Sequence, residues 1–187
     1  MRRPFQRYWT LSSRPEPGRP LWIGSRGLLL WALWLGAFIS FTAAGRLTWP
    51  HMTFAPIAWA FLPMWQSLWT LVLSRRAPNP LPAHRRLDLY FKGYGPWYAF
   101  ILLWSGLCLF APHTRALVMG SFLVLGLIHL VLFSWSVLTT WALYRAAFGF
   151  SRWGASWRTL VFYLSVLASI LLYYLLAGQL WPLMEAP

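Results

Sequence analysis

Acidic residues are almost absent from this sequence. The chain of 187 residues contains only three of them, Glu16, Asp88 and Glu185, and all three lie outside the long apolar runs. Proton relays and ion pathways within a membrane are built from ionisable side chains at membrane depth. The scarcity of carboxylates therefore speaks against a proton relay, a sodium site or acid catalysis within the membrane.

Residues that form other catalytic or metal sites are also scarce. Cys108 is the single cysteine, which excludes an internal disulfide and a cysteine cluster. His51 and His113 lack a third ligand for a metal site. No H-E-x-x-H motif, Gly-rich phosphate loop or Ser/His/Asp set is present. We therefore predict a protein that is not an enzyme and holds no structural metal.

Charge as a whole is low, and apolar residues are abundant. Only 10% of the residues are charged, whereas 59% are hydrophobic and 15 are tryptophans. Soluble domains carry about a quarter charged residues. Five apolar segments reach the roughly 20 residues that a membrane-spanning helix needs, and they are too uniformly apolar for barrel strands. We predict an all-α integral membrane protein with a bundle over 27–187 and spans at 27–45, 54–74, 96–112, 116–144 and 159–182.

Basic residues alternate along these segments. In chain order, the six stretches outside the spans contain six, one, five, one, three and no basic residues, which accounts for all 16. Loops rich in arginine and lysine stay in the cytoplasm. The alternation predicts a cytoplasmic N-terminus, an outer or periplasmic C-terminus, and a location in the bacterial cytoplasmic membrane.

The net charge of +13 raises the question of nucleic-acid binding. No nucleic-acid motif accompanies it, and all but two of the cations lie on the predicted cytoplasmic side. Anionic lipid headgroups attract cations at that surface. We therefore expect anionic lipids as partners and no nucleic acid.

Residues 1–26 form a basic, Pro-rich segment ahead of the first span. Its prolines interrupt any long helix. We expect this cytoplasmic arm to dock on a partner subunit or on anionic lipid. The residues proposed for the contact are Arg2, Arg3, Arg7, Tyr8 and Trp9.

The stretch HRRLDLYFKGYGPWY, residues 84–98, leads into the third span. Asp88 has Arg85 and Lys92 at helical spacing, which predicts a short interfacial helix with local ion pairs. Pro96 suits the start of a helix because its missing N–H would be unpaired there. The aromatic residues around it are expected to form a belt at the membrane interface.

Small residues recur every fourth position in the first span. Ala32, Gly36 and Ser40 form this stripe. Small side chains allow a second helix to approach closely. The stripe predicts a helix–helix contact, either within the bundle or with a partner subunit.

His129 is the ionisable residue at the middle of a predicted span. Gly126, Phe133, Ser136 and Thr140 share its face at helical spacing. The stripe is expected to face protein or a cofactor. One interpretation makes the imidazole an axial ligand of a chlorophyll, a bacteriochlorophyll or a haem, with Gly126 leaving room for the ring. The others are a hydrogen bond to a neighbouring helix, or a partner subunit packed on Gly126.

This turn resembles photosynthetic light-harvesting helices, which place a small residue four positions before a histidine. Here Leu125 occupies that position, and the small residue Gly126 lies three positions before His129. The resemblance implies a pigment-bearing complex.

The segment ALYRAAFGFSRWGASWRTLVFYL, residues 142–164, resembles the loop before the last helix of Yip1-type membrane proteins, which share the five-span topology. This resemblance implies a free-standing protein of trafficking or transport type. The other function that stays open is a non-catalytic structural subunit of a large bioenergetic complex, photosynthetic or respiratory, bound to other membrane subunits. The lack of catalytic groups, the aromatic richness and His129 favour this second function.

Overall fold

The computed structural model describes residues 34–37, 55–110 and 122–184, and these residues form helices joined by short turns, with no strand among them. The elements are α4 (Ala55–Leu73), α5 (Ala83–Lys92), α6 (Gly95–Phe110), α8 (Phe122–Ala142), a π-helical turn η1 (Leu143–Ala147) and α9 (Arg152–Met184). A short helical turn at 34–37 precedes them. The predicted all-helical class is confirmed for this part of the chain.

Two of the helices are long and apolar enough to cross a membrane. They cover Leu123–Ala147 and Arg152–Leu176, and the apolar part of α4, Phe61–Leu73, is shorter. Little of either long segment is buried inside the protein, as expected of helices that have lipid for a solvent. Their length and composition favour a membrane location.

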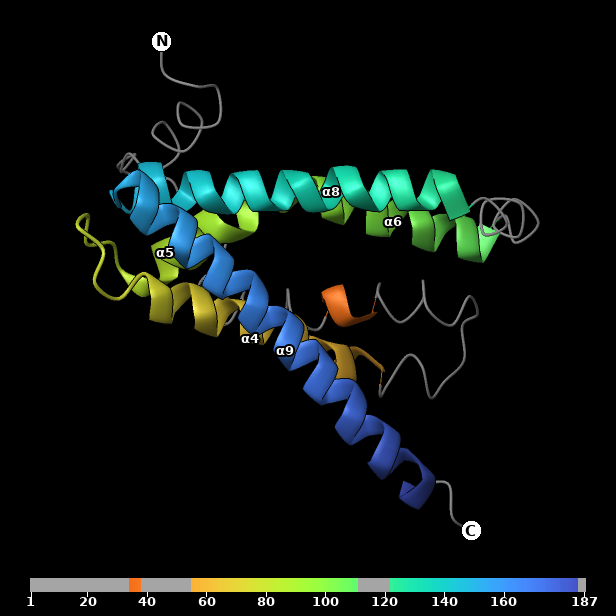
Figure 1. The fold of residues 1–187 in the computed structure, drawn as a ribbon. Helices are drawn as coiled ribbons and strands as arrows, with labels where there is room; N and C mark the ends of the chain where they lie inside the picture. Colours follow the sequence, from red (N-terminus) through yellow and green to blue (C-terminus); the bar gives the residue numbers. More distant parts are fainter. Residues whose placement is uncertain (1–33, 38–54, 111–121, 185–187) are drawn as a thin grey trace.

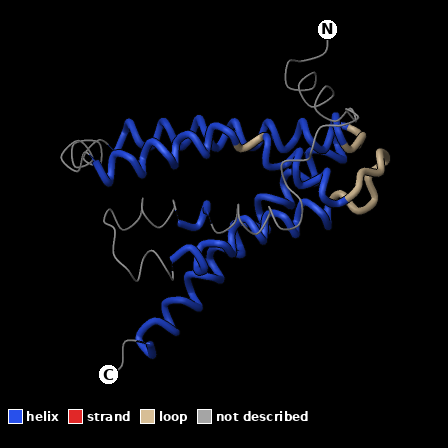
Figure 2. The backbone as a smooth tube through the Cα atoms, turned by 180° about the vertical axis from the view of Figure 1, so that it is seen from behind, coloured by secondary structure: helices blue, strands red, loops and turns tan. Residues whose placement is uncertain are grey.

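The helices form two limbs that diverge from one end. The first limb contains α6 and α8, which lie side by side, and the second contains α4 and α9 (Figure 1). The view from behind shows the same divergence (Figure 2). Helices α4 and α8 run toward the shared end, and α6 and α9 run away from it. The short helix α5 lies at this end, between α4 and α6 in the chain.

Aromatic side chains connect the two helices of each limb. In the second limb the rings of Phe61 and Tyr173 stack with their centroids 4.8 Å apart. In the first limb Trp97 donates a hydrogen bond to Ser136 Oγ, and Trp135 Nε1 donates to the Gly93 carbonyl at 3.1 Å. Indole rings bury much apolar area and still satisfy their N–H, so they suit contacts between helices in lipid.

The main core lies at the end where the limbs meet. Tyr90, Tyr144, Phe148 and Phe162 are almost fully buried there. The Tyr90 and Phe162 rings lie 5.5 Å apart, which brings α5 against α9. Helix α5, the η1 turn with the bend after it, and α9 thus share one aromatic cluster at a single end of the molecule.

The predicted short helix and its ion pairs are confirmed, but part of the predicted aromatic belt packs inside the protein. Helix α5 has Asp88 paired with Arg85 and Lys92, as the spacing predicted. Its aromatic residues Tyr90 and Phe91 are buried rather than arranged as an exposed belt. They are buried because the turn after η1 and the first part of α9 cover them.

Helix α9 begins before the apolar run that defines the predicted span at 159–182. Its first residue is Arg152, so that Arg158 lies inside the helix rather than in a loop. The helix can carry this cation because its guanidinium bonds back to the protein: Nε donates to the Leu73 carbonyl at 3.0 Å and Nη1 to the Gly154 carbonyl at 3.1 Å.

Residues 73–79 contact residues 147–158, and we call this contact region the helix junction. Asn79 donates its backbone N–H to the Phe148 carbonyl and its side-chain amide to the Ala147 carbonyl, at 3.1 and 3.3 Å. Gly149 follows with a φ of 78°, a conformation that favours glycine. A Cβ at Gly149 would lie 2.9 Å from the Asn79 amide nitrogen. The junction therefore needs glycine here for its backbone angle and for the close approach of Asn79.

Candidate functional site

The imidazole of His129 is held on two sides and open on a third. Its Nδ1 lies 2.8 Å from the carbonyl oxygen of Leu125, one turn earlier in α8. A carbonyl only accepts hydrogen bonds, so Nδ1 carries the proton and Nε2 of the neutral ring keeps its lone pair. The rings of Trp97 and Phe100 from α6 meet the imidazole edge to face, with centroids 6.2 and 5.3 Å away.

One interpretation of the sequence was a hydrogen bond from His129 to a neighbouring helix, and the structure differs from it. The hydrogen-bond partner of His129 is a carbonyl of its own helix, and the side chain is exposed. Among the described residues no hydrogen bond reaches Nε2. The imidazole therefore presents an unoccupied nitrogen acceptor at the middle of a long apolar helix.

The polar stripe on α8 divides into a buried half and an open half. Ser136 and Thr140 are buried, and Thr140 Oγ1 lies 3.3 Å from the Tyr163 hydroxyl of α9. Ser136 donates to the Leu132 carbonyl at 2.8 Å and accepts from Trp97. Phe133, half exposed, packs its ring 5.4 Å from that of Tyr163. The stripe faces protein near the helix junction, and its open half begins at His129.

Gly126 lies in the open half. It is exposed, and a Cβ added at this position would meet nothing within 4 Å. The described part of the chain therefore leaves space beside His129 on the face that the two residues share. Gly36 of the first predicted span is buried. The other residues predicted for interfaces, Ala32 and Ser40 and the arm residues Arg2, Arg3, Arg7, Tyr8 and Trp9, lie outside the described residues.

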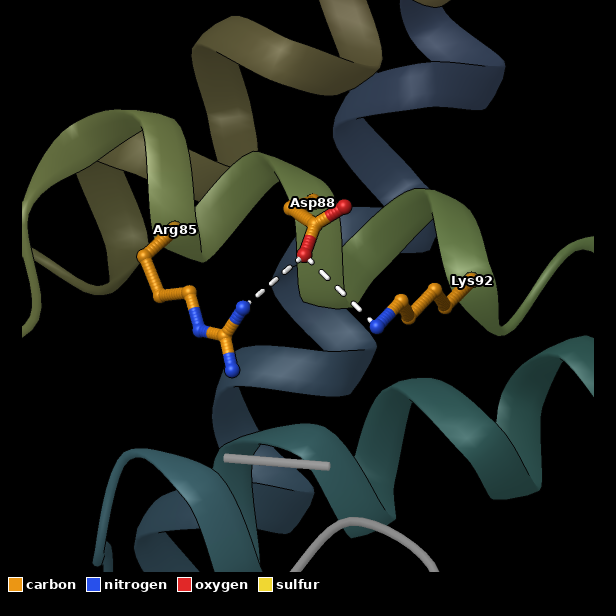
Figure 3. A network of polar contacts seen from close by, with 3 residues as sticks. All are labelled: Arg85, Asp88 and Lys92. Atoms are coloured by element: carbon orange, nitrogen blue, oxygen red, sulfur yellow. Dashed lines mark hydrogen bonds and ion pairs between the residues drawn. The ribbon is translucent and has the colours of Figure 1, made fainter. Parts of the chain in front are cut away.

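A buried carboxylate at the helix junction end is the second polar site. Asp88 is 2% exposed, and its Oδ2 lies 3.3 Å from Arg85 Nη1 and 3.8 Å from Lys92 Nζ (Figure 3). The partners are more accessible, at 17% and 41%. A buried charge persists only when cations or donors compensate it. Asp88 therefore holds the charged face of α5 together.

Replacing Asp88 by asparagine should destabilise the purified chain. The change preserves volume but removes the charge that Arg85 faces, and hydrogen bonds to charged groups contribute about 1.5–3 kcal/mol. We expect a loss of this size in the free energy of unfolding, measured by denaturant titration in detergent. Lys92→Met is the matched control, because exposed ion pairs contribute about 0–1 kcal/mol. Equal losses in both variants would contradict the assigned role of Asp88.

Two tyrosines that follow Asp88 in the chain, Tyr90 and Tyr94, are buried packing groups. Burial raises the pKa of Tyr90 well above its usual value, and burial is also the largest cause of the raised pKa of Tyr94. Both phenols therefore remain protonated at any physiological pH. Their rings lie 4.8 Å apart and pack α5 against the turn that leads into α6.

The residues of the helix junction were not identified from the sequence. In the sequence, Arg158 counted only as one of the basic residues that predict the orientation in the membrane. In the structure its guanidinium lies 3.6 Å from the centre of the Phe150 ring. Arg145 Nη1 donates to the Phe150 carbonyl at 2.8 Å. Gly149 between two aromatic residues was the local signal of a special turn. Its partner Asn79 is distant in sequence and no spacing rule connects them.

Comparison with known proteins gives no relative for this chain. No protein-family model, no curated protein and no solved structure matches it.

Proposed function

We propose that the chain is a non-catalytic structural subunit of a larger bioenergetic membrane complex, photosynthetic or respiratory. In this proposal it spans a bacterial cytoplasmic membrane five times, with its N-terminus in the cytoplasm and its C-terminus outside. Its partners are other membrane subunits and anionic lipids. Chemistry is performed elsewhere in the complex, and this chain positions and stabilises the assembly.

The observation that carries the proposal is the contrast between the helix junction and the limbs. The polar side-chain contacts with the largest sequence separations, 68 and 85 residues, lie at the junction, whereas both limbs expose large apolar side chains. Trp153 and Trp157 at the start of α9 are 87% and 65% exposed. Tryptophan is enriched where a protein surface binds a partner. A rigid end with two diverging apolar limbs suits a subunit that is held between others.

The distribution of arginine supports the proposed orientation. The two basic segments 75–92 and 145–158 meet at the same end of the molecule, since Arg158 bonds to Leu73 and Asn79 bonds to Ala147. Positive-inside topology requires these two loops on one side of the membrane. A reporter fused within 75–86 should therefore read as cytoplasmic and one fused after residue 187 as extracytoplasmic.

Extraction of the affinity-tagged chain from its own membranes in a mild detergent tests the subunit role. We expect native mass spectrometry to show the chain bound to other membrane proteins in a fixed ratio. Replacing Arg2, Arg3 and Arg7 by alanine should lower recovery of these partners, because each basic residue near an anionic surface contributes about 1 kcal/mol. Replacing the exposed Arg75 and Arg76 is the control that removes charge elsewhere.

Two results would contradict the proposal. A chain that migrates alone, whatever the detergent, would favour the free-standing Yip1-like alternative. Equal recovery of partners with the arm variant and with the control would remove the docking role of the arm.

A further inference from the structure

We infer that Nε2 of His129 is the axial ligand of a planar metal tetrapyrrole that lies against α8 over Gly126. The inference deepens the proposed function, because it requires the chain in a membrane, but it does not require a partner subunit. It rests on three features of the site: the tautomer of the imidazole, the apolar environment of its free nitrogen and the open space beside it.

The first feature is the state of the imidazole. Because the Nδ1–H donates a hydrogen bond to the Leu125 carbonyl, Nε2 is the nitrogen with the lone pair in the neutral imidazole. A histidine that ligates a metal almost always donates its other N–H to a carbonyl, a carboxylate or a water. The hydrogen bond of His129 to Leu125 therefore matches the one that ligating histidines make.

The second feature is the environment of that lone pair. His129 lies within Leu123–Ala147, and its exposed neighbours in α8 include Leu130 and Val131. Hydrocarbon offers no water to donate a hydrogen bond, and an unpaired polar group there is costly. A metal ion at the centre of an apolar ring satisfies the nitrogen while its macrocycle covers the apolar face. A water-soluble metal ion would not do so, since no cluster of three metal-ligating side chains exists among the described residues.

The third feature is room for a flat ligand. Gly126 shares the face of His129, and nothing among the described residues fills the space where its side chain would be. Trp97 and Phe100 approach the imidazole only from the side of α6. They restrict rotation of the imidazole and leave Nε2 accessible. Among the described residues His129 offers the single ligand of this site, and one axial ligand suits magnesium in a chlorin and iron in a high-spin haem alike.

Titration of the purified chain in lipid nanodiscs with zinc protoporphyrin IX tests the site, since zinc in this ring takes one axial ligand. We expect the Soret band to move to the position of the imidazole adduct and to saturate at one ring per chain. His129→Leu should weaken binding by at least about tenfold, because loss of an outer-shell partner alone typically costs 10–100-fold in metal affinity. Gly126→Leu should weaken it too, by filling the space for the ring. His84→Leu, in an exposed position on α5, should bind as the unmodified chain does.

A further variant separates ligation from packing. His129→Gly should lose the shift and recover it when free imidazole is added, which a merely structural role would not produce. Binding that is equal in the unmodified chain and in His129→Leu, or a Soret band that stays at its unligated position, would overturn the inference while leaving the subunit role intact. Spectra of the chain from its own membranes then identify the ring. Bands that change on reduction with dithionite identify a haem, and a long-wavelength band that does not change identifies a magnesium chlorin.

Discussion

Phe162→Ala is expected to lower the free energy of unfolding of the purified chain by about 3–5 kcal/mol, the usual cost of removing a buried phenylalanine side chain. Phe162 is fully buried, and its ring lies between Tyr90 of α5 and Tyr163 of its own helix, with centroids 5.5 and 5.3 Å away. The alanine variant leaves a cavity where α5 meets α9. Denaturant titration in detergent, followed by tryptophan fluorescence and circular dichroism, measures the loss.

Trp157→Ala is the matched control, because it removes an even larger aromatic side chain from the same helix. Trp157 is 65% exposed and so lies outside the core in the isolated chain. We expect the control to change the free energy of unfolding by less than about 1 kcal/mol, as is usual for surface substitutions. A control that costs as much as Phe162→Ala would show that the core lies elsewhere.

Arg158→Met should produce the second large effect, a loss of about 3 kcal/mol. The change keeps an unbranched apolar stem but removes the guanidinium, which donates to the Leu73 and Gly154 carbonyls and stacks on Phe150. Charged hydrogen bonds contribute about 1.5–3 kcal/mol and a cation–π contact about 0.5–2 kcal/mol. The same denaturant titration measures the loss.

Arg152→Met serves as its control, since this arginine begins the same helix and is exposed. Removing either cation lowers the net charge equally. If Arg158 acted only by keeping its loop in the cytoplasm, the two variants would behave alike. We expect the Arg158 variant alone to unfold more readily, and in addition to show faster proteolysis in the turn at 148–151.

The helices were predictable because their signals are local. Long uncharged runs predicted α4, α6, α8 and α9, and the spacing of Asp88 with its two cations predicted α5. Periodicity within one segment is enough for such predictions. It does not reveal which other segment covers a face, and for this reason the burial of Tyr90 beneath α9 was missed.

The candidate site likewise has some features that could be predicted from the sequence and others that could not. The position of His129 and the glycine on its face could be read from spacing. The bond from its Nδ1 to Leu125 could not, because a histidine at that position can equally turn toward another helix. The helix junction was the least predictable part, since Arg158 and Leu73 are 85 residues apart and meet through a backbone carbonyl that carries no sequence signal.

That separation has a consequence for how the chain is made. The carbonyl that accepts from the Asn79 side chain lies 68 residues later in the chain, and Arg158 lies 85 residues after Leu73. Most of the protein must therefore be synthesised before either contact can form. During synthesis the end of α4 and the whole of α5 exist without the segment that covers them. A nascent chain halted before α9 would leave the aromatic residues of α5 uncovered, open to chaperones and membrane proteases. Completion of the last helix is thus the step at which α5 becomes covered and the helix junction can form.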